Sequence, residues 1–269
     1  MAVTDLLDRY GPWALVAGAS EGIGAAFARA LAEAGLNLVL IARREGPLEA
    51  LAAELRTRFH RSIETIVMDL ASPDLEPRLE RLSSEHEIGL FVYNAALSVV
   101  APFLDTSLED KERMVDVNVR GPLVTTHVFG RAMAARGRGG IVLVSSLTAF
   151  WGSPWVATYG ATKAFNLSLG EALAHELAER GVDVVVSCAG ATRTPGFVDL
   201  VAGREAPSSM EPEAVARETL RALPSRTAFV PGAGNRWAQL LLSRVLSRKL
   251  AIRIMAGHTK PLLRRGVDR

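Results

Sequence analysis

Cysteine is nearly absent from this sequence, in which Cys188 is the only residue of its kind. A single thiol cannot form an internal disulfide, so the sequence gives no sign of an oxidising compartment. Cys188 lies in the apolar, strand-like run VDVVVSCAG (182–190), where a thiol behaves as a small buried hydrophobe. We therefore expect it to be structural rather than nucleophilic.

Long hydrophobic runs and metal-binding patterns are missing too. No stretch reaches the roughly 18 uninterrupted apolar residues of a membrane-spanning helix. Acidic residues occur too early in MAVTDLLDRYGPW for a secretory signal, so a cytoplasmic protein is expected. His127 and His175 lie in predicted helices without a ligand partner at metal spacing, and no metal is predicted.

Apolar residues are plentiful: 49% of the 269 residues are hydrophobic and 22% are charged, which suits one sizeable core. We expect a single domain spanning residues 1–269. Seven short apolar runs alternate with helical stretches, and runs that are apolar throughout suit strands covered on both faces. The expected strands are 13–17, 38–42, 63–68, 90–94, 141–145, 182–187 and 228–231. This order predicts an α/β fold with a doubly wound, mostly parallel sheet of about seven strands and helices on both faces, the Rossmann fold.

The first expected strand runs directly into AGASEGIGAAF (17–27), which places Gly18, Gly22 and Gly24 just before a helix. Glycines there permit a tight turn and let a pyrophosphate approach the free N–H groups of the helix N-terminus. A sharp turn without a ligand is the alternative. The position of the glycine segment directly after the first strand favours a dinucleotide site.

The second expected strand ends in LIARRE (40–45). An acidic residue at its end would bind the ribose hydroxyls of NAD, whereas Arg43 and Arg44 can pair with a 2′-phosphate. NADP is therefore favoured over NAD, although Glu21 and Glu45 lie nearby and solvated arginines are common. Asp69, which follows the third strand, is placed either to accept a hydrogen bond from the adenine amino group or to cap a turn.

Ligands of open α/β sheets bind beyond the carboxyl ends of the strands. There the sequence places YNAA (93–96), a serine pair (145–146) and CAGATRT (188–194), and the helix after the fifth strand carries Tyr159 and Lys163. Together these segments of residues 12–232 resemble the short-chain dehydrogenase/reductase family, of the compact single-domain kind. AGASEGIG has its G-x-x-x-G-x-G spacing. The family's asparagine, serine, tyrosine and lysine correspond to Asn118, Ser146, Tyr159 and Lys163.

The resemblance implies hydride transfer between a nicotinamide and a carbonyl carbon. Tyr159 would be the general acid and base, and the ammonium of Lys163 would favour its phenolate and bind the nicotinamide ribose. Ser146 would bind the substrate carbonyl, Asn118 would hold a water that passes protons to Lys163, and Thr194 would bind the carboxamide. The predicted cofactor-binding residues are Gly18, Ser20, Gly22, Ile23, Gly24, Arg43, Arg44, Asp69, Leu70, Asn94, Ala95, Tyr159, Lys163, Thr192 and Thr194.

Three positions depart from the family pattern. Tyr93 stands where asparagine is usual, Ala96 where glycine is usual, and Ala189 where proline usually precedes the glycine. The methyl group of Ala96 is expected to narrow the cofactor's approach without removing the function of the segment.

A substrate lid is predicted at 191–211, a segment rich in proline, glycine and small residues between the sixth strand and the next helix. Apolar and aromatic side chains near the site favour a hydrophobic ketone or alcohol over a sugar. The predicted substrate contacts are Leu97, Leu147, Trp151, Trp155 and Phe197.

Charge is unevenly distributed. Residues 233–269 contain nine Lys/Arg and one acidic residue, whereas the remainder contains 22 basic and 28 acidic residues. This basic extension resembles that of bacterial family members, and an amphipathic helix is predicted in it. Its basic row holds Arg236, Arg244 and Arg248, and its apolar row holds Trp237, Leu241 and Val245. A cover over the substrate mouth or a subunit contact is favoured over an anchor to an anionic membrane surface. The acidic remainder argues against nucleic-acid binding.

These features predict an NADP-dependent oxidoreductase that interconverts a hydrophobic ketone and a secondary alcohol. A homodimer or homotetramer formed through helices in 110–135 and 155–180 is expected. A catalytically silent nucleotide-binding regulatory or scaffold protein of the same fold is the alternative. A sugar-nucleotide epimerase is disfavoured by the glycine spacing and by the lack of a substantial second domain.

Overall fold

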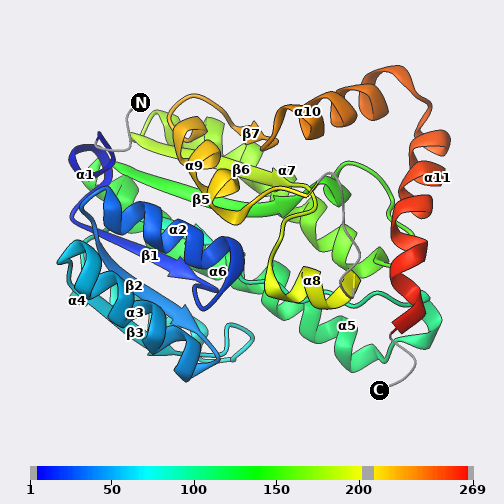
Figure 1. Cartoon of the computed structure of the whole chain (residues 1–269). Coiled ribbons are helices and arrows are strands. Elements are labelled where there is room, and N and C mark those ends of the chain that lie inside the picture. Colours follow the sequence, from blue (N-terminus) through cyan, green and yellow to red (C-terminus); the bar gives the residue numbers. More distant parts are fainter. Residues whose placement is uncertain (1–4, 202–208, 266–269) are drawn as a thin grey trace.

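The structure, a computed structural model, describes residues 5–201 and 209–265. Its strands are β1 (Trp13–Ala17), β2 (Asn37–Ala42), β3 (Ile63–Val67), β4 (Ile88–Tyr93), β5 (Gly139–Ser146), β6 (Val182–Ala189) and β7 (Ala228–Phe229). They form one parallel sheet in the order β3-β2-β1-β4-β5-β6-β7 (Figure 1). The predicted α/β fold with a doubly wound parallel sheet of seven strands is confirmed.

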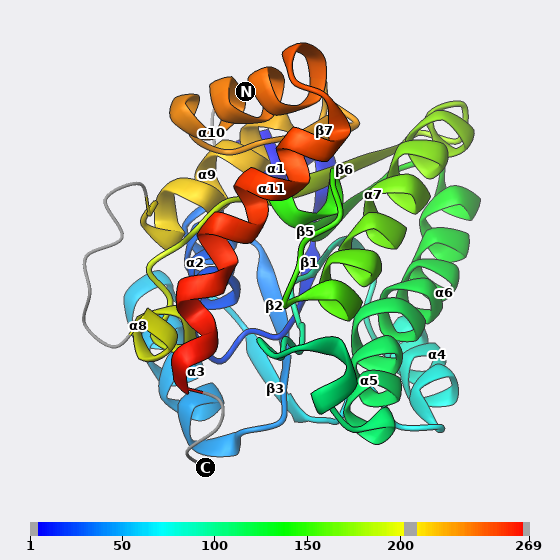
Figure 2. The same ribbon diagram turned by 90° about the vertical axis from the view of Figure 1, so that its right-hand side faces the viewer.

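Helices cover both faces of the sheet (Figure 2). One face is covered by α1 (Asp5–Tyr10), α2 (Gly22–Glu33), α3 (Glu45–Phe59) and α9 (Pro212–Ala222), and the other by α4 (Leu75–Glu85), α6 (Gly121–Arg136) and α7 (Ala157–Ala178). Ala14 and Val16 of β1 enter one buried apolar cluster, while Leu15 enters the other, as the alternation of side chains along a strand requires. Gly170 brings α7 close to the sheet, since a Cβ there would lie 2.1 Å from Val186.

The order of the strands reverses between β1 and β4, and this switch point determines where the candidate binding site lies. Parallel sheets of this kind leave a crevice at such a switch point, outside the carboxyl ends of the strands. Ala17, at the end of β1, pairs with Tyr93, at the end of β4. The glycine turn and the YNAA segment therefore meet at the switch point.

The sequence of 109–137 has a helical pattern, but this stretch is divided in the structure. A five-residue π-helical turn, η2 (Asp116–Arg120), separates α5 (Leu108–Val115) from α6. It is defined by a hydrogen bond from the Gly121 N–H to the Asp116 carbonyl, five residues earlier. Such turns occur frequently at functional sites, and Asn118 lies in the middle of this one.

Four short elements were not predicted from the sequence. They are the helix α1, the 3₁₀ turns η1 (Phe103–Asp105) and η3 (Leu147–Ala149), and the helix α8 (Pro195–Val201) inside the predicted lid. Each is too short to show a helical hydrophobic period, so periodicity could not mark it.

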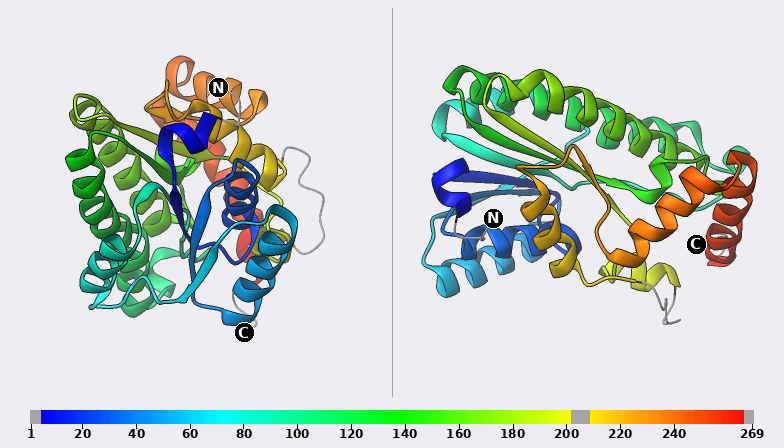
Figure 3. Two further views of the ribbon diagram at one scale, coloured as in Figure 1. Left: turned by 90° about the vertical axis from the view of Figure 1, so that its left-hand side faces the viewer. Right: turned by 90° about the horizontal axis from the view of Figure 1, so that it is seen from above.

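The C-terminal extension differs from the predicted single helix. It consists of α10 (Ala233–Leu240), the π-turn η4 (Leu241–Val245), α11 (Arg248–Thr259) and the 3₁₀ turn η5 (Lys260–Arg265). Leu246 has an extended backbone, and the Ser247 hydroxyl caps α11 by accepting from the Leu250 N–H. Arg248 consequently lies on a different helix from Arg236. Figures 1 and 3 show the extension at the end of the molecule to which the strands point.

Candidate active site

A cavity of about 540 Å³ opens at the carboxyl ends of β1 to β4, a size suited to a bound small molecule. The predicted cofactor residues that line it are Gly18, Ser20, Gly22, Ile23, Arg43, Arg44, Asp69, Leu70, Asn94, Ala95 and Thr194. Ala42, Met68 and Val117 also line it and were not predicted, because apolar side chains carry no motif. Ala96 is exposed on the same lining.

The glycine turn lies between β1 and α2. Gly18 and Gly22 have φ values of +81° and +57°, in the left-handed region that favours glycine. A Cβ on Gly24 would lie 1.9 Å from the Gly18 carbonyl oxygen, which accepts from Asn94 Nδ2 at 2.9 Å. The Glu21 side chain does not cap α2, so the first amides of this helix can bind a phosphate. The turn therefore fits a dinucleotide pyrophosphate.

Charged side chains gather where β2 and β3 end. Arg44 forms an ion pair of 2.6 Å with Glu21, whereas Arg43 has no ion pair within residues 5–201 and 209–265. Asp69 pairs with Arg113 of α5 at 2.6 Å and accepts from the backbone amide two residues on. Burial opposes the ionisation of Asp69, but these donors outweigh it and lower its pKa. Sequence reasoning missed Arg113, because nothing in the motif order brings α5 to this edge.

Ser146, Tyr159 and Lys163 come together where β5 ends and α7 begins. Lys163 Nζ donates to the Val144 carbonyl at 2.8 Å, and Ser145 Oγ donates to the Lys163 carbonyl at 2.7 Å. The Lys163 ammonium lies 5.6 Å from the centroid of the Tyr159 ring. Two hydrogen bonds with β5, one donated and one accepted by Lys163, therefore fix the position of the lysine of the predicted Tyr–Lys pair.

Burial sets the protonation of this pair. It raises the pKa of Tyr159, and a hydrogen bond with the Ser146 hydroxyl offsets part of the rise. Lys163 is 2% exposed, and burial lowers its pKa to about 8, with an opposing effect from Cys188. The direction for Tyr159 is opposite to that expected from the ammonium alone. Near neutral pH the phenol is thus protonated and able to donate.

Asn118 is fully buried and connects α7 to the cavity. Its side chain accepts from the Leu97 N–H and donates to the Leu97 carbonyl, both at 2.8 Å, and donates to Thr162 Oγ1 at 3.1 Å. The Tyr93 hydroxyl donates to the Val117 carbonyl at 2.7 Å, inside the π-turn. Tyr93, a departure from the family pattern, thus supports the turn that carries Asn118. Sequence reasoning missed this role, because the contact spans 24 residues.

Gly121 and Tyr93 are fitted to each other, since a Cβ on Gly121 would lie 1.9 Å from the Tyr93 hydroxyl oxygen. We expect Gly121→Ala to lower the free energy of unfolding by about 2–3 kcal/mol through overpacking. Tyr93→Phe should cost about 1–2 kcal/mol, because the Val117 carbonyl loses its partner. In the double variant the cost should be less than additive, since the clashing oxygen is gone. Urea unfolding measures all three, and strictly additive costs would contradict the contact.

The predicted substrate residues occupy different positions. Leu97 lines the cavity, and Leu147 is partly buried at the start of η3. Trp151 is 6% exposed and therefore belongs mainly to the packing of the loop. Trp155 has a φ of +69°, a strained conformation for a bulky residue, and its Nε1 is buried without a partner among the described residues. Phe197 is partly buried on α8.

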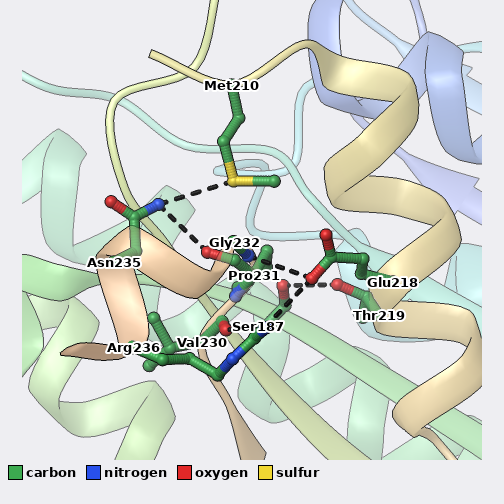
Figure 4. Close-up of polar contacts among 9 residues, drawn as sticks. All are labelled: Ser187, Met210, Glu218, Thr219, Val230, Pro231, Gly232, Asn235 and Arg236. Atoms are coloured by element: carbon green, nitrogen blue, oxygen red, sulfur yellow. Dashed lines mark hydrogen bonds and ion pairs between the residues drawn. The ribbon is translucent and has the colours of Figure 1, made fainter. Parts of the chain in front are cut away.

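The predicted lid at 191–211 contains α8, and its residues 202–208 lie outside the described part of the chain. The two ends of the segment are held together by a β-bridge between Thr192 and Met210. Asn235 Nδ2 lies 3.5 Å from the Met210 sulfur, at the start of α10 (Figure 4). The base of the lid therefore contacts the beginning of the extension.

Glu218 of α9 fastens the extension to the body of the protein (Figure 4). Its carboxylate accepts from the Gly232 N–H at 3.0 Å and from Arg236 at 3.1 Å, and Arg236 also donates to the Val230 carbonyl at 3.2 Å. Arg236, one of the three residues of the predicted basic row, therefore does more than face solvent, because its side chain positions α10.

Helix α11 contacts the loop that leads into α7. Thr259 Oγ1 donates to the Pro154 carbonyl at 2.9 Å, and Arg248 donates to the Phe150 carbonyl at 3.4 Å. The same loop carries Trp151 and Trp155, two of the predicted substrate residues. The extension thus packs against the expected substrate side of the site.

The described residues contain neither a membrane-spanning helix nor a metal-binding cluster. No helix there is long and apolar enough to cross a bilayer, and no group of three or more His, Cys, Asp or Glu side chains is placed to hold a metal ion. Cys188 is fully buried, and burial raises the pKa of its thiol to about 12. A thiol held in this way is a poor nucleophile, as expected from its sequence position.

Known proteins share this architecture. The short chain dehydrogenase family matches residues 12–205. A 7beta-hydroxysteroid dehydrogenase of Mediterraneibacter gnavus is 33% identical over 236 residues, which cover 86% of this chain and 90% of that protein. A solved 7beta-hydroxysteroid dehydrogenase structure is 32% identical with a TM-score of 0.86, over 93% of this chain and 98% of the other. A short-chain dehydrogenase of Sphingobium yanoikuyae, solved with NADPH, is 31% identical with a TM-score of 0.76, over 88% and 97%.

The matched residues 12–205 include the glycine turn, Asn118, Ser146, Tyr159 and Lys163. The likeness to the Mediterraneibacter enzyme extends over most of both chains. This chain belongs to the short-chain dehydrogenase/reductase family and is an NAD(P)-dependent oxidoreductase that acts on CH–OH groups.

Proposed function

We propose that the protein is an NADP-dependent oxidoreductase that interconverts a hydrophobic ketone and a secondary alcohol, with Tyr159 as the general acid and base. The observation that carries the proposal is the junction of β5 and α7, where Ser146, Tyr159 and Lys163 meet. Asn118 joins this junction to Leu97 on the cavity lining. A phenol, a hydroxyl and a buried cation at one point can hold and protonate a carbonyl oxygen.

The chemistry follows from these groups. NADPH, when bound, supplies the hydride that reduces the carbonyl carbon. Tyr159 gives its phenolic proton to the carbonyl oxygen, and Ser146 Oγ donates a hydrogen bond to the same oxygen and stabilises its developing negative charge. The ammonium of Lys163 lowers the cost of the phenolate that remains, and a proton from solvent restores the phenol. Oxidation of the alcohol uses the same groups in reverse.

The proposed function is tested by NADPH consumption with a panel of bulky ketones and, for comparison, of sugars of similar size. Turnover of the apolar ketones is expected, because Leu97 lines the cavity and the partly buried Leu147 directly follows Ser146. The name of the Mediterraneibacter relative, a hydroxysteroid dehydrogenase, supports the same substrate class. Preferential turnover of the sugars would contradict the proposed class.

The cofactor preference is proposed from Arg43, and it gives a prediction. Arg43→Ala should raise the Kd of NADPH about tenfold and leave that of NADH unchanged, because only NADPH carries a 2′-phosphate to pair with the guanidinium. Arg44→Ala should have a smaller effect, since Glu21 already holds Arg44. Fluorescence titration of both cofactors measures the constants. Equal affinity of the unmodified protein for NADH and NADPH would overturn the preference.

A homodimer or homotetramer is proposed, with α5 and α6 in the contact. Leu108, Val115 and Leu123 on these helices are 69%, 43% and 46% exposed, and a subunit contact would cover them. Light scattering after size-exclusion chromatography measures the assembly. A monomer at micromolar concentration would contradict the proposed contact.

We propose that the extension covers the substrate side of the site, as the contacts of α11 with the loop at 150–154 suggest. Weak contact with an anionic membrane is the alternative use, because Trp237 and Val245 are 73% and 69% exposed beside basic residues. Flotation with anionic and neutral vesicles separates the two, since a cover alone gives no binding to either. The cytoplasmic location expected from the composition stays a prediction.

A further inference from the structure

Asn166 is a buried polar residue next to the catalytic groups that the sequence motifs do not include. It lies on α7, three residues after Lys163 and seven after Tyr159, and this spacing places the three on one side of the helix. Its side chain is 2% exposed. A buried amide on this side of the catalytic helix requires hydrogen-bond partners on neighbouring elements.

One partner is the catalytic asparagine. Asn166 Nδ2 donates to the Asn118 backbone carbonyl at 3.1 Å, across 48 residues of sequence. A carbonyl oxygen can only accept, so the amide nitrogen has to face it, and this fixes the orientation of the amide. Asn166 thereby positions a carbonyl within the π-turn, where the i→i−4 ladder of the helix is interrupted.

The other end of the amide is an acceptor. Asn166 Oδ1 is buried and has no hydrogen-bond partner within the described residues. The Lys163 ammonium carries three N–H donors, one of which goes to the Val144 carbonyl. The Asn118 amide is already committed to Leu97 and Thr162. Within the described residues the Lys163 ammonium makes one hydrogen bond, so two of its donors are available to an acceptor on this side of the helix.

We propose that Asn166 is a positioning residue of the proton relay, resting on the proposed function: its Nδ2 fixes the Asn118 carbonyl, and its Oδ1 accepts from a water bound to the Lys163 ammonium. An acceptor in this position stabilises the charged form of Lys163. The other titratable groups facing Lys163 are Tyr159 on the same helix and Cys188 on β6.

Two variants of similar size test this role in opposite directions. Asn166→Leu removes both the donor and the acceptor, so the pKa of Lys163 should fall and the alkaline limb of the kcat profile should move to lower pH. Asn166→Asp places a carboxylate there, so both should move to higher pH. For Asn166→Leu, kcat should fall about tenfold, while the Kd of NADPH should change less than twofold.

The Lys163 titration is read directly by NMR in protein labelled with ¹³C-lysine, since the chain has only four lysines. This readout needs no turnover, so it separates failure of the inference from failure of the proposed function. Opposite shifts of the Lys163 resonance in the two variants, with folding verified by thermal melting, would support the role. An unchanged titration in both folded variants would overturn it, whatever their activity.

Discussion

Replacing Tyr159 by phenylalanine is expected to lower kcat for ketone reduction by about 10³-fold, within the range of general acid catalysis. The variant removes a single oxygen atom and keeps the ring beside the Lys163 ammonium. Because burial raises the pKa of Tyr159, the phenol is protonated at neutral pH and its proton is the one lost in the variant. NADPH can still bind, but the carbonyl oxygen has lost the group that gives it a proton.

Steady-state rates and the Kd of NADPH together measure this effect. The Kd of NADPH should stay within about threefold of the original, because the cofactor cavity is lined by other side chains. Tyr10→Phe is a matched control, since Tyr10 lies on α1 and bonds to Asp183, away from the site. A Tyr159→Phe variant with more than a tenth of the original kcat would rule out Tyr159 as the proton donor.

Replacing Lys163 by methionine is expected to abolish turnover and at the same time to stabilise the protein. Below pH 8 the folded protein holds a buried ammonium whose pKa has fallen from 10.5 to about 8. This shift corresponds to about 3 kcal/mol that opposes folding of the original protein. In the methionine variant the Val144 carbonyl loses its hydrogen-bond donor, which costs about 1 kcal/mol. A net gain of about 2 kcal/mol at pH 7 is expected.

The pH dependence gives this prediction its sign. Between pH 8 and 10.5 the folded protein has lost the Lys163 proton while the unfolded chain still binds it, so the cost of burial fades as the pH rises. The advantage of the methionine variant should therefore shrink over that interval. Urea unfolding at pH 7 and pH 10 measures it, with the exposed Lys249→Met as control. A Lys163→Met variant less stable than the original at pH 7 would contradict the account.

The expected gain of stability and loss of activity in Lys163→Met have one physical cause. Active sites hold groups in environments that oppose folding, and their removal commonly stabilises a protein at the expense of activity. The buried ammonium of Lys163 is such a group, since within the described residues it makes one hydrogen bond, to the Val144 carbonyl, and lies beside the Tyr159 ring.

The sheet could be predicted from the sequence because its strands are apolar throughout. Each of the seven predicted runs overlaps one strand, and the run at 13–17 coincides with β1. Burial on both faces leaves a strong and simple signal in such strands. The glycine turn could also be predicted, because only glycine at position 24 fits the close approach to the Gly18 carbonyl.

The π-turn at Asp116–Arg120 could not be predicted, because its sequence DVNVR has the composition of an ordinary helix. What sustains the turn is supplied from elsewhere in the chain, by Tyr93 on β4 and Asn166 on α7. Tyr93 appeared in the sequence only as a departure from the family pattern. Its role became visible when the fold placed its hydroxyl beside Gly121.

The charged residues that follow β2 and β3 were also only partly predictable from the sequence. Arg43 and Arg44 are equivalent in the sequence, but the structure pairs Arg44 with Glu21 and brings Arg113 onto Asp69. Ion pairs depend on distances between side chains from separate elements, and sequence order does not contain them. The assignment of the 2′-phosphate to Arg43 therefore rests on the fold.

Hydride transfer from the nicotinamide to a ketone is the central claim, and it can be followed by isotope. The protein is incubated with a bulky apolar ketone and NADPH deuterated at the transferring position, and the product is examined by mass spectrometry. The account predicts a secondary alcohol with one deuterium on the carbinol carbon, formed by the unmodified protein and not by Tyr159→Phe. Tight binding of NADPH without deuterated alcohol from any ketone of the panel would contradict it and favour a nucleotide-binding protein without turnover.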